Sequence, residues 1–145
     1  MADKKYDRYF ITEPVINGED VKKRLAFLGT QHFSGFNYWV RWNCFTKPRL
    51  FKDQPHAHDF DQVFHFMGGD PRDITDFRAF VEFTLEGEKH IFDRMTLIYV
   101  PKGMIHCPIE VTKVEKPIMF MNVALTGEYE RVGEGPITMY PPEEL

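Results

Sequence analysis

Two histidines one residue apart, His56 and His58, are the residues in this sequence best placed to do chemistry. In an extended segment the side chains alternate between two faces, so this spacing puts both imidazoles on the same side. Gln62 follows four residues after His58 and can bring an amide oxygen to the same point after a slight bend. A third imidazole lies far downstream, at His106 in the segment PKGMIHCP. Three imidazoles and an amide oxygen suit a borderline divalent ion, so the sequence predicts a metal site.

The segments that must position these residues are predicted to be short β-strands. Runs of aromatic, β-branched or alternating residues favour strands. These runs cover residues 37–45, 60–67, 79–85, 90–92, 96–100, 108–114 and 118–125. The run at 96–100 is nearly all apolar, and we expect it to be buried on both faces. Short strands separated by turn residues predict an all-β sandwich or barrel.

The N-terminal part is expected to contain the one helix of the chain. Residues 1–16 include a short apolar patch that ends at Pro14, as an edge strand or an arm would. Asn17 then resembles a helix cap, and Gly29 is well placed to end a helix. Apolar side chains at helical spacing lie between them, at Val21, Leu25 and Leu28. The pattern predicts one helix over residues 18–28.

Length and composition indicate one globular domain of 145 residues, 43% hydrophobic and 28% charged. We expect residues 1–35 to form an arm and the helix, residues 36–125 the barrel, and residues 126–145 a C-terminal extension. The formal charge of -4 gives no basic field for nucleic acid, and no apolar run is long enough to span a bilayer. The polar start lacks a signal-peptide core, and two cysteines without a CxxC pair favour the cytoplasm.

The histidine spacing resembles the first motif of the cupin family. That motif is His-x-His, three or four residues, Glu, six residues and Gly, and its spacing is matched by His56, His58, Gln62 and Gly69. The one departure is that glutamine stands in place of glutamate. The resemblance extends over residues 36–125.

A second cupin motif is also recognisable. Its pattern is Gly, five residues, Pro-x-Gly, two residues, His, three residues and Asn, and it is matched by Pro101, Gly103 and His106. Met95 replaces the first glycine and Glu110 replaces the asparagine. The resemblance implies an all-β fold, a cupin jelly-roll β-barrel with one short N-terminal helix. Cupins that carry a metal hold it inside the barrel near one mouth.

The resemblance also implies a ligand set of His56, His58, Gln62 and His106 for a divalent transition metal, either Zn, Fe, Ni or Mn. The alternative for the paired histidines is a surface strand that carries them by chance. Gln62 is neutral, so the ion would keep its full charge and pull strongly on a bound oxygen, at the cost of weaker capture of the metal. Gln62 could instead hydrogen-bond a metal-bound water without being a ligand.

Arg41 and Trp39 share one face of strand 37–45 and are candidates for substrate binding. Arg41 could hold a substrate carboxylate with two hydrogen bonds, and the alternative is an exposed arginine. His65 and His90 lie outside the motif spacing, and we expect them at the surface or beside the ligands.

Three further residues adjoin the motifs. Asp59 and Asp61 could orient imidazole N–H groups, and the alternative for both is a solvated loop acid. Cys107 follows His106 directly, so strand alternation is expected to turn its thiol away from the metal.

Cupins are functionally diverse, so the resemblance does not specify a reaction. The leading hypothesis is a metal-dependent enzyme that acts on a small polar oxygen-bearing molecule by Lewis-acid chemistry, as an isomerase, lyase or hydrolase. The alternatives are a non-catalytic cupin that binds a small molecule, a cupin dioxygenase and a metal-free structural cupin. We expect a homodimer because pairing covers exposed sheet edges, with the N-terminal arm and the strand around Trp39 as the contact.

Overall fold

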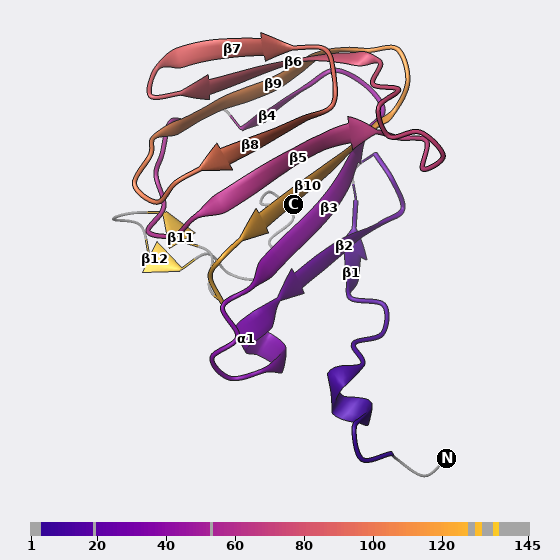
Figure 1. The fold of residues 1–145 in the computed structure, drawn as a ribbon, viewed down its shortest axis with the longest axis vertical. Helices are drawn as coiled ribbons and strands as arrows, with labels where there is room; N and C mark the ends of the chain where they lie inside the picture. The colour runs from indigo at the N-terminus through magenta and orange to yellow at the C-terminus, as the bar shows by residue number, and fades with distance from the viewer. Residues whose placement is uncertain (1–3, 19, 53, 128–129, 132–134, 137–145) are drawn as a thin grey trace.

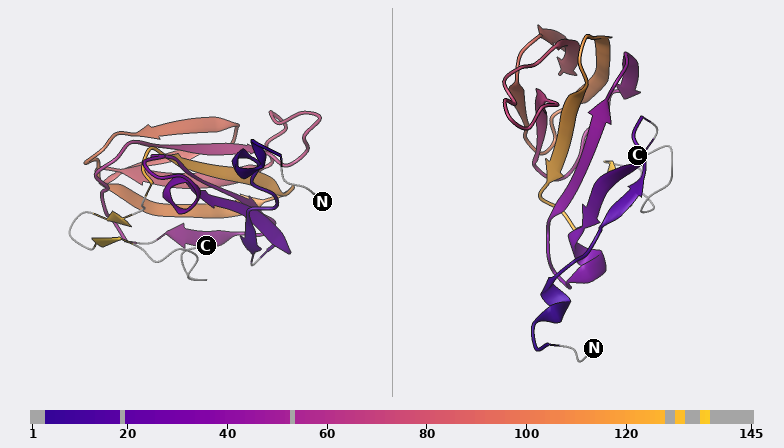
Figure 2. Two further views of the ribbon diagram at one scale, coloured as in Figure 1. Left: turned by 90° about the horizontal axis from the view of Figure 1, so that it is seen from below. Right: turned by 90° about the vertical axis from the view of Figure 1, so that its right-hand side faces the viewer.

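The computed structural model describes residues 4–18, 20–52, 54–127, 130–131 and 135–136, and two antiparallel sheets make up most of it (Figures 1 and 2). The larger sheet contains, in spatial order, β1 (Val15–Asn17), β2 (Lys23–Leu28), β3 (Trp39–Phe45), β10 (Ile118–Ala124), β5 (Gln62–Gly68) and β8 (Thr96–Val100). The smaller sheet contains β4 (Arg49–Lys52), β9 (His106–Val114), β6 (Ala79–Leu85) and β7 (Glu88–Phe92). The remaining elements are η1 (Asp7–Tyr9), α1 (Gly29–His32), β11 (Glu130–Arg131) and β12 (Gly135–Pro136).

The predicted all-β architecture is confirmed, but the sheets do not close into a barrel. In the described chain, β1 and β8 are the edges of one sheet, and β4 and β7 are the edges of the other. These edges are not joined in one hydrogen-bonded ladder, because the sheets meet through their side chains. The result is an open jelly-roll sandwich. The N-terminal segment with η1 extends beyond the sheets at one end (Figure 2).

The helix predicted over residues 18–28 is wrong, because strand β2 occupies its second half. β2 pairs with β1 on one side and β3 on the other. Arg24, Ala26 and Leu28 are buried and alternate with exposed or half-buried residues. Because the inward position 24 is an arginine, the sequence does not show this alternation as a pattern of apolar residues. The helical spacing of Val21, Leu25 and Leu28 is coincidental. The helix α1 begins at Gly29, and no helix within the described residues has the length and hydrophobicity of a membrane span.

The N-terminal residues therefore contribute to the main sheet. β1 and β2 fall within residues 1–35, predicted as arm and helix, and they extend the six-stranded sheet at one edge. The edge strand considered for residues 1–16 begins late, at Val15. Most of the predicted extension at 126–145 lies outside the described residues.

Aromatic side chains fill the space between the sheets. Their positions alternate along the strands, so that each strand directs every second residue inward. The buried core includes Phe45, Phe64, Phe66, Phe77, Phe83 and Phe120, together with valine and isoleucine side chains from both sheets. The ring of Phe120 lies 5.0 Å from that of Phe66 and 5.7 Å from that of Phe45 between centroids. This packing accounts for much of the high phenylalanine content.

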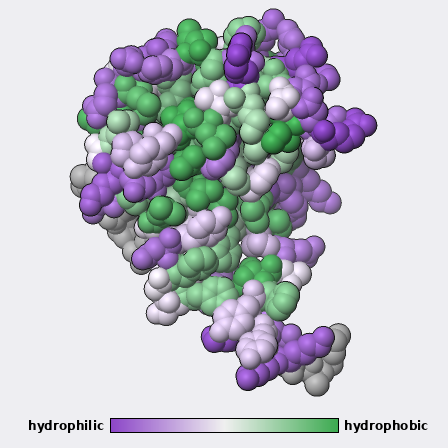
Figure 3. Space-filling view, viewed as in Figure 1, coloured by the Kyte–Doolittle hydropathy of each residue, from purple (hydrophilic) through white to green (hydrophobic). Residues whose placement is uncertain are grey.

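The outer face of the six-stranded sheet is also apolar, and part of it is open. Figure 3 shows hydrophobic residues gathered over the middle of the molecule, across the strands of this sheet. On β8, Leu97 is 55% exposed and Tyr99 is 59% exposed. The expectation that strand 96–100 is buried on both faces is therefore wrong. The outward side chains of β8 form part of the apolar outer face of the sheet. No other part of the described chain covers that face at β8.

Candidate metal centre

The three predicted histidines lie side by side at the end of the aromatic core. The ring centroids are 4.8 Å apart for His56 and His58, 4.4 Å for His56 and His106, and 5.1 Å for His58 and His106. His58 and His106 are buried, and His56 is half-buried. The ring of Phe64 lies 5.9 Å from that of His106 and joins the cluster to the core. Metal binding by this cluster stays a prediction.

Backbone hydrogen bonds between the two motif segments hold the histidines together. His56 and His106 exchange both of their backbone bonds, with N–O distances of 3.1 and 2.9 Å. The backbone N–H of Gly103 donates to the carbonyl of His58 at 2.8 Å. Gly103 has a φ of +84°, a conformation that glycine adopts without strain. The Pro-x-Gly turn therefore brings the second motif against the first.

Backbone carbonyls orient two of the rings. The Nδ1 atom of His56 lies 2.7 Å from the carbonyl oxygen of Gln54, and Nδ1 of His106 lies 3.1 Å from that of Met104. A carbonyl only accepts, so Nδ1 carries a proton in each ring, and Nε2 is the nitrogen that can bind a metal when the ring is neutral. A neutral imidazole held in this way is the form that binds a metal ion.

Asp59 and Asp61, which flank the first motif, make their described contacts with Lys102 and Tyr99 and not with the histidines. The Oδ1 atom of Asp61 accepts from the backbone N–H of Lys102 at 2.9 Å and from the Tyr99 hydroxyl at 3.2 Å. Asp59 lies 3.8 Å from the Lys102 ammonium, and both side chains are exposed. Desolvation, and then the charge of Asp61, raise the pKa of Tyr99. The acids thus fasten the turn that carries Gly103, and the carbonyls take the orienting role that the sequence suggested for Asp59 and Asp61.

The hydrogen bonding of Gln62 indicates whether the predicted ligands suit a metal ion. Its side chain is 1% exposed, and its Nε2 donates to Oδ1 of Asn122 at 3.1 Å. Its Oε1 is buried and has no hydrogen-bond partner within the described residues. A buried carbonyl oxygen without a donor costs about 1–3 kcal/mol, and a cation or its bound water would relieve that cost. Gln62 shares the inner face of β5 with Phe64, so the donor set fits a metal at this end of the core.

Cys107 joins the cluster, contrary to the sequence-based expectation. One ligand atom each from His56, His106 and Cys107 lie within 4.8 Å of one another, and Cys107 is 2% exposed. Cys107 has a φ of 88°, which breaks the alternation so that two consecutive residues of β9 face inward. The expectation that its thiol turns away from the site is therefore wrong. The available signal was Pro108, because a proline within a strand marks a place where regular pairing fails.

Comparisons with known proteins address the fold. No protein-family model matches the sequence, and no curated protein matches it. An oxalate oxidase solved in complex with the substrate analogue glycolate aligns with 90% of this chain and 66% of its own, with a TM-score of 0.58 and 9% identity. An RmlC-like cupin from Shewanella frigidimarina aligns over 70% and 73%, with a TM-score of 0.45 and 16% identity. KdgF from Halomonas sp. aligns over 80% and 91%, with a TM-score of 0.48 and 16% identity.

The chain has a cupin fold. Of the motif residues, His58, Gln62 and His106 are buried in this fold, and the backbone of His56 pairs with that of His106. At these identities the similarity establishes the fold alone, and the function has to be argued from the site.

Arg41 and Trp39 lie inside this cupin fold. Arg41 is 7% exposed and Trp39 is 4% exposed, so the alternative of an exposed arginine is wrong. The guanidinium carbon of Arg41 lies 4.7 Å from the centre of the Trp39 ring. The other buried polar side chains of the six-stranded sheet are Arg24, Asn43, Gln62 and Asn122. Sequence reasoning missed Arg24, Asn43 and Asn122, because polar residues on a strand ordinarily indicate a face exposed to solvent.

The two remaining histidines considered from sequence lie apart from the cluster. His65 is half-buried, and its Nδ1 lies 3.1 Å from the carbonyl oxygen of Met121. His90 is exposed and lies 2.7 Å from the Glu88 carboxylate. Motif spacing therefore separated the clustered histidines from these two.

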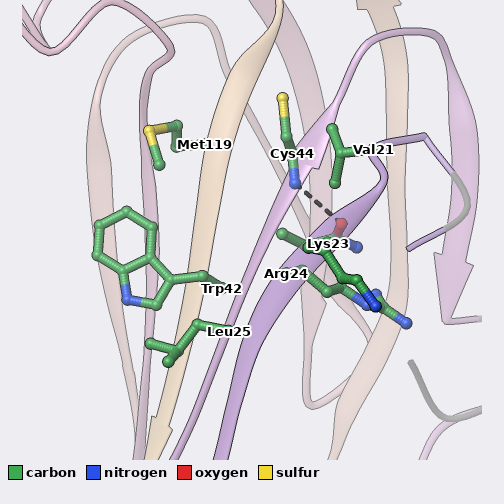
Figure 4. A pocket seen from close by; sticks show the side chains of 8 residues that line it. Val21, Lys23, Arg24, Leu25, Trp42, Cys44 and Met119 are labelled. Atoms are coloured by element: carbon green, nitrogen blue, oxygen red, sulfur yellow. Dashed lines mark hydrogen bonds between the residues drawn. The ribbon is translucent and has the colours of Figure 1, made fainter. Parts of the chain in front are cut away.

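A separate cavity of about 340 Å³ opens where β2 and β3 diverge (Figure 4). Pairing between these strands is confined to Ala26–Leu28 on the β2 side, which leaves a gap beyond it. Leu25, Trp42 and Met119 line one side of the gap, and Cys44 lies across from them (Figure 4). Burial, and then the charge of nearby Asp20, raise the pKa of the Cys44 thiol. Most of this lining belongs to the outer side of the sheet, away from the histidines.

Proposed function

We propose that this cupin is a metal-dependent enzyme that acts on a small polar oxygen-bearing molecule by isomerase, lyase or hydrolase chemistry. One observation carries the proposal. Three imidazoles gather with ring centroids no more than 5.1 Å apart. Gln62, which shares the inner face of β5 with the Phe64 that packs on His106, has a buried amide oxygen with no donor within the described residues. A cluster of this kind costs stability unless an ion or its water occupies it.

His56, His58, His106 and Gln62 are the residues that would hold the ion, with the Cys107 thiol beside them. A divalent ion bound there supplies Lewis-acid polarisation of a substrate oxygen. The protein's own contribution is orientation and exclusion of water. The carbonyls of Gln54 and Met104 fix two rings, and Phe60 stacks on the His58 ring at 4.7 Å between centroids.

Gln62 limits the proton chemistry that the site performs. An amide does not accept a proton at neutral pH, so Gln62 orients a group but is not a general base. The flanking acids Asp59 and Asp61 contact Lys102 and Tyr99 instead. This observation favours a second candidate, a cupin that binds a small molecule without turnover. A cupin dioxygenase is the third candidate, with oxygen as the co-substrate.

Elemental analysis of protein purified without chelators tests metal binding. We expect about one equivalent of a transition metal per chain in the wild type, because the cluster forms one site. His106→Ala should lose it. His90→Ala is the matched control, since His90 is exposed and lies outside the cluster, and it should keep the metal. A wild-type protein with no bound metal, even after incubation with Zn²⁺, Fe²⁺, Ni²⁺ and Mn²⁺, would refute the proposal.

Turnover separates an enzyme from a binding protein. The metal-loaded protein is incubated with small hydroxy acids and dicarboxylic acids, with glycolate and oxalate as first probes, and consumption is followed by NMR with and without oxygen. Consumption that requires the metal but not oxygen supports the proposal. Oxygen-dependent consumption supports the dioxygenase, and saturable binding without consumption supports the second candidate.

We also propose that the protein is a homodimer. The N-terminal segment carries exposed aromatic side chains, with Tyr9 53% exposed and Phe10 78% exposed. Trp39 itself faces inward, so the contact on its strand would use the outer side, where Trp42 is half-buried. Light scattering should give twice the chain mass, and Phe10→Asp should shift the protein toward the monomer. A monomer at high micromolar concentration would contradict the proposal.

A further inference from the structure

We propose that Arg41 binds the carboxylate of the substrate, so that the ligand class of this cupin is a small carboxylic acid. The inference rests on the proposed function, because the other end of the acid is placed at the histidine cluster. It assigns to Arg41 a binding role and to Trp39 a positioning role.

The first support is the place of Arg41 in the fold. Its side chain is 7% exposed and alternates along β3 with Val40 and Trp42, so it lies on the same face as the core residue Phe45. Arg24, on the neighbouring β2, is 5% exposed and shares this face with Ala26, which pairs with Arg41. Two guanidinium groups are therefore held on the inner side of the six-stranded sheet.

Hydrogen bonding and strand register connect Arg41 to the predicted metal site. Gln62 on β5 donates to Asn122 on β10 at 3.1 Å. Asn122 is the direct cross-strand partner of Arg41 on β3. Gln62 itself lies opposite Ala124, two residues along β10 from Asn122, so its hydrogen bond to Asn122 is diagonal. Two strand spacings of about 4.8 Å and this offset of two residues separate the backbones of Arg41 and Gln62 by roughly 12 Å.

Aromatic packing provides a second, independent connection. The ring of Phe60 stacks on that of His58, and Phe60 belongs to the same buried cluster as Trp39. Trp39 in turn lies under the Arg41 guanidinium at 4.7 Å. One connection runs from Gln62 and the other from His58, and both lead to the Arg41 guanidinium, so Arg41 lies in the same interior region as these two residues.

The chemistry of these side chains selects a carboxylate. A guanidinium is charged at every accessible pH, and its planar set of donors matches the two oxygens of a carboxylate. Stacking on Trp39 fixes the plane of that donor set. The buried polar side chains of the described residues are arginine, histidine, asparagine, glutamine and threonine, and none is acidic. Among the described side chains of this region, a carboxylate would meet the guanidinium of Arg41 and the amide of Asn122.

Calorimetric titration of the full-length protein with malate tests the inference, and malamide, its neutral diamide, is the matched ligand. We expect saturable binding of malate and at least about tenfold weaker binding of malamide, because the charge-assisted pair is lost. Arg41→Gln should weaken malate binding by at least about tenfold. Arg72→Gln is the matched control, since the Arg72 side chain is 88% exposed, and it should bind as the wild type does.

Two further variants keep the test decisive if Arg41→Gln does not fold. Arg41→Lys retains the charge and should still lose affinity for malate, because the planar donor pair is gone. Asn122→Asp places a carboxylate beside Arg41 with almost no change in shape, and it should compete with malate. Trp39 fluorescence, isolated in the Trp42→Phe background, should respond to malate in the wild-type site and not in these variants.

The outcomes separate the two proposals. Metal binding together with equal affinity for malate and malamide, or unchanged affinity in Arg41→Lys and Asn122→Asp, overturns the carboxylate site and leaves the metal centre standing. Malate binding that depends on Arg41 in a protein that takes up no metal supports the carboxylate site and overturns the proposed function. Loss of malate affinity in all three variants, in a protein that binds metal, supports both.

Discussion

The two ends of the space between the sheets differ in chemistry, although the same strands build both. At one end the inner side chains are Phe45 on β3, Phe66 on β5, and Ile118 and Phe120 on β10; we call this the aromatic end. At the other end they include Arg41 on β3, Gln62 on β5 and Asn122 on β10, with His106 from β9 and the ring of Phe64 opposite Asn122; we call this the polar end. Strand register aligns the change, since Asn122 lies opposite Arg41 and Ile118 lies opposite Phe45.

The difference separates the main source of stability from the proposed site of function. The rings of the aromatic end bury apolar surface, which is the main favourable contribution to folding. The polar end buries amides, imidazoles and guanidinium groups, and such groups lower stability unless each is well partnered. The change from phenylalanine to arginine within a few residues of β3 agrees with the binding role that we propose for its polar end.

Removing a ring from the aromatic end is expected to have the largest effect on stability. Phe120→Ala should lower the free energy of unfolding by about 3–5 kcal/mol, because the cavity is surrounded by other rings and relaxes little. Metal content should not change. Urea denaturation measures the loss, and Phe80→Ala, at a side chain that is 40% exposed, is the control and should cost less than about 1 kcal/mol. Equal losses for the two variants would contradict the division between the ends.

Metal removal should act through the polar end alone. Free Zn²⁺ at a hundredfold excess over its dissociation constant stabilises the folded state by about 2.7 kcal/mol, and a chelator removes that increment. His106→Ala should abolish the increment, whereas Phe80→Ala should keep it. Thermal unfolding with and without chelator measures the difference. A full increment in His106→Ala would place the bound metal elsewhere on the chain.

Exchanging the amide for a carboxylate should strengthen the polar end. Gln62→Glu is expected to bind divalent metal about tenfold more tightly, because it adds a negative ligand. The added charge should also raise the pKa of acids at the site, so any pH–rate profile shifts upward. Gln31→Glu, at an exposed position, is the charge-matched control. If Gln62→Glu leaves both the affinity and the pH profile unchanged, Gln62 lies outside the working site.

Replacing the thiol of Cys107 tests whether this residue belongs to the polar end as a ligand. Of the four changes, it is expected to alter stability least. With Co²⁺ bound, a thiolate ligand gives a sulfur charge-transfer absorption in the near-ultraviolet. We expect this absorption in the wild type and in Cys44→Ser, and its loss in Cys107→Ser. Identical spectra for the two serine variants would show that Cys107, although close to His56 and His106, does not bind the ion.

Local pattern was sufficient for most of the strands. Residues 79–85 and 96–100 were predicted with the limits that β6 and β8 have, because alternation and turn residues mark them clearly. The pattern failed in β2, where the buried Arg24 interrupts the apolar alternation. It also failed for the exposure of β8, since hydrophobicity does not say which sheet face remains open.

The sequence by itself determined which histidines gather, because motif spacing singled out His56, His58 and His106 from six histidines. Only the tertiary structure decided that Cys107 faces the cluster and that Arg41 lies in the same interior. The first depends on a positive φ that strand periodicity does not encode, and the second depends on the register between strands far apart in the chain. Spacing along a strand fixes which side chains share a face, whereas the pairing of strands fixes which faces meet.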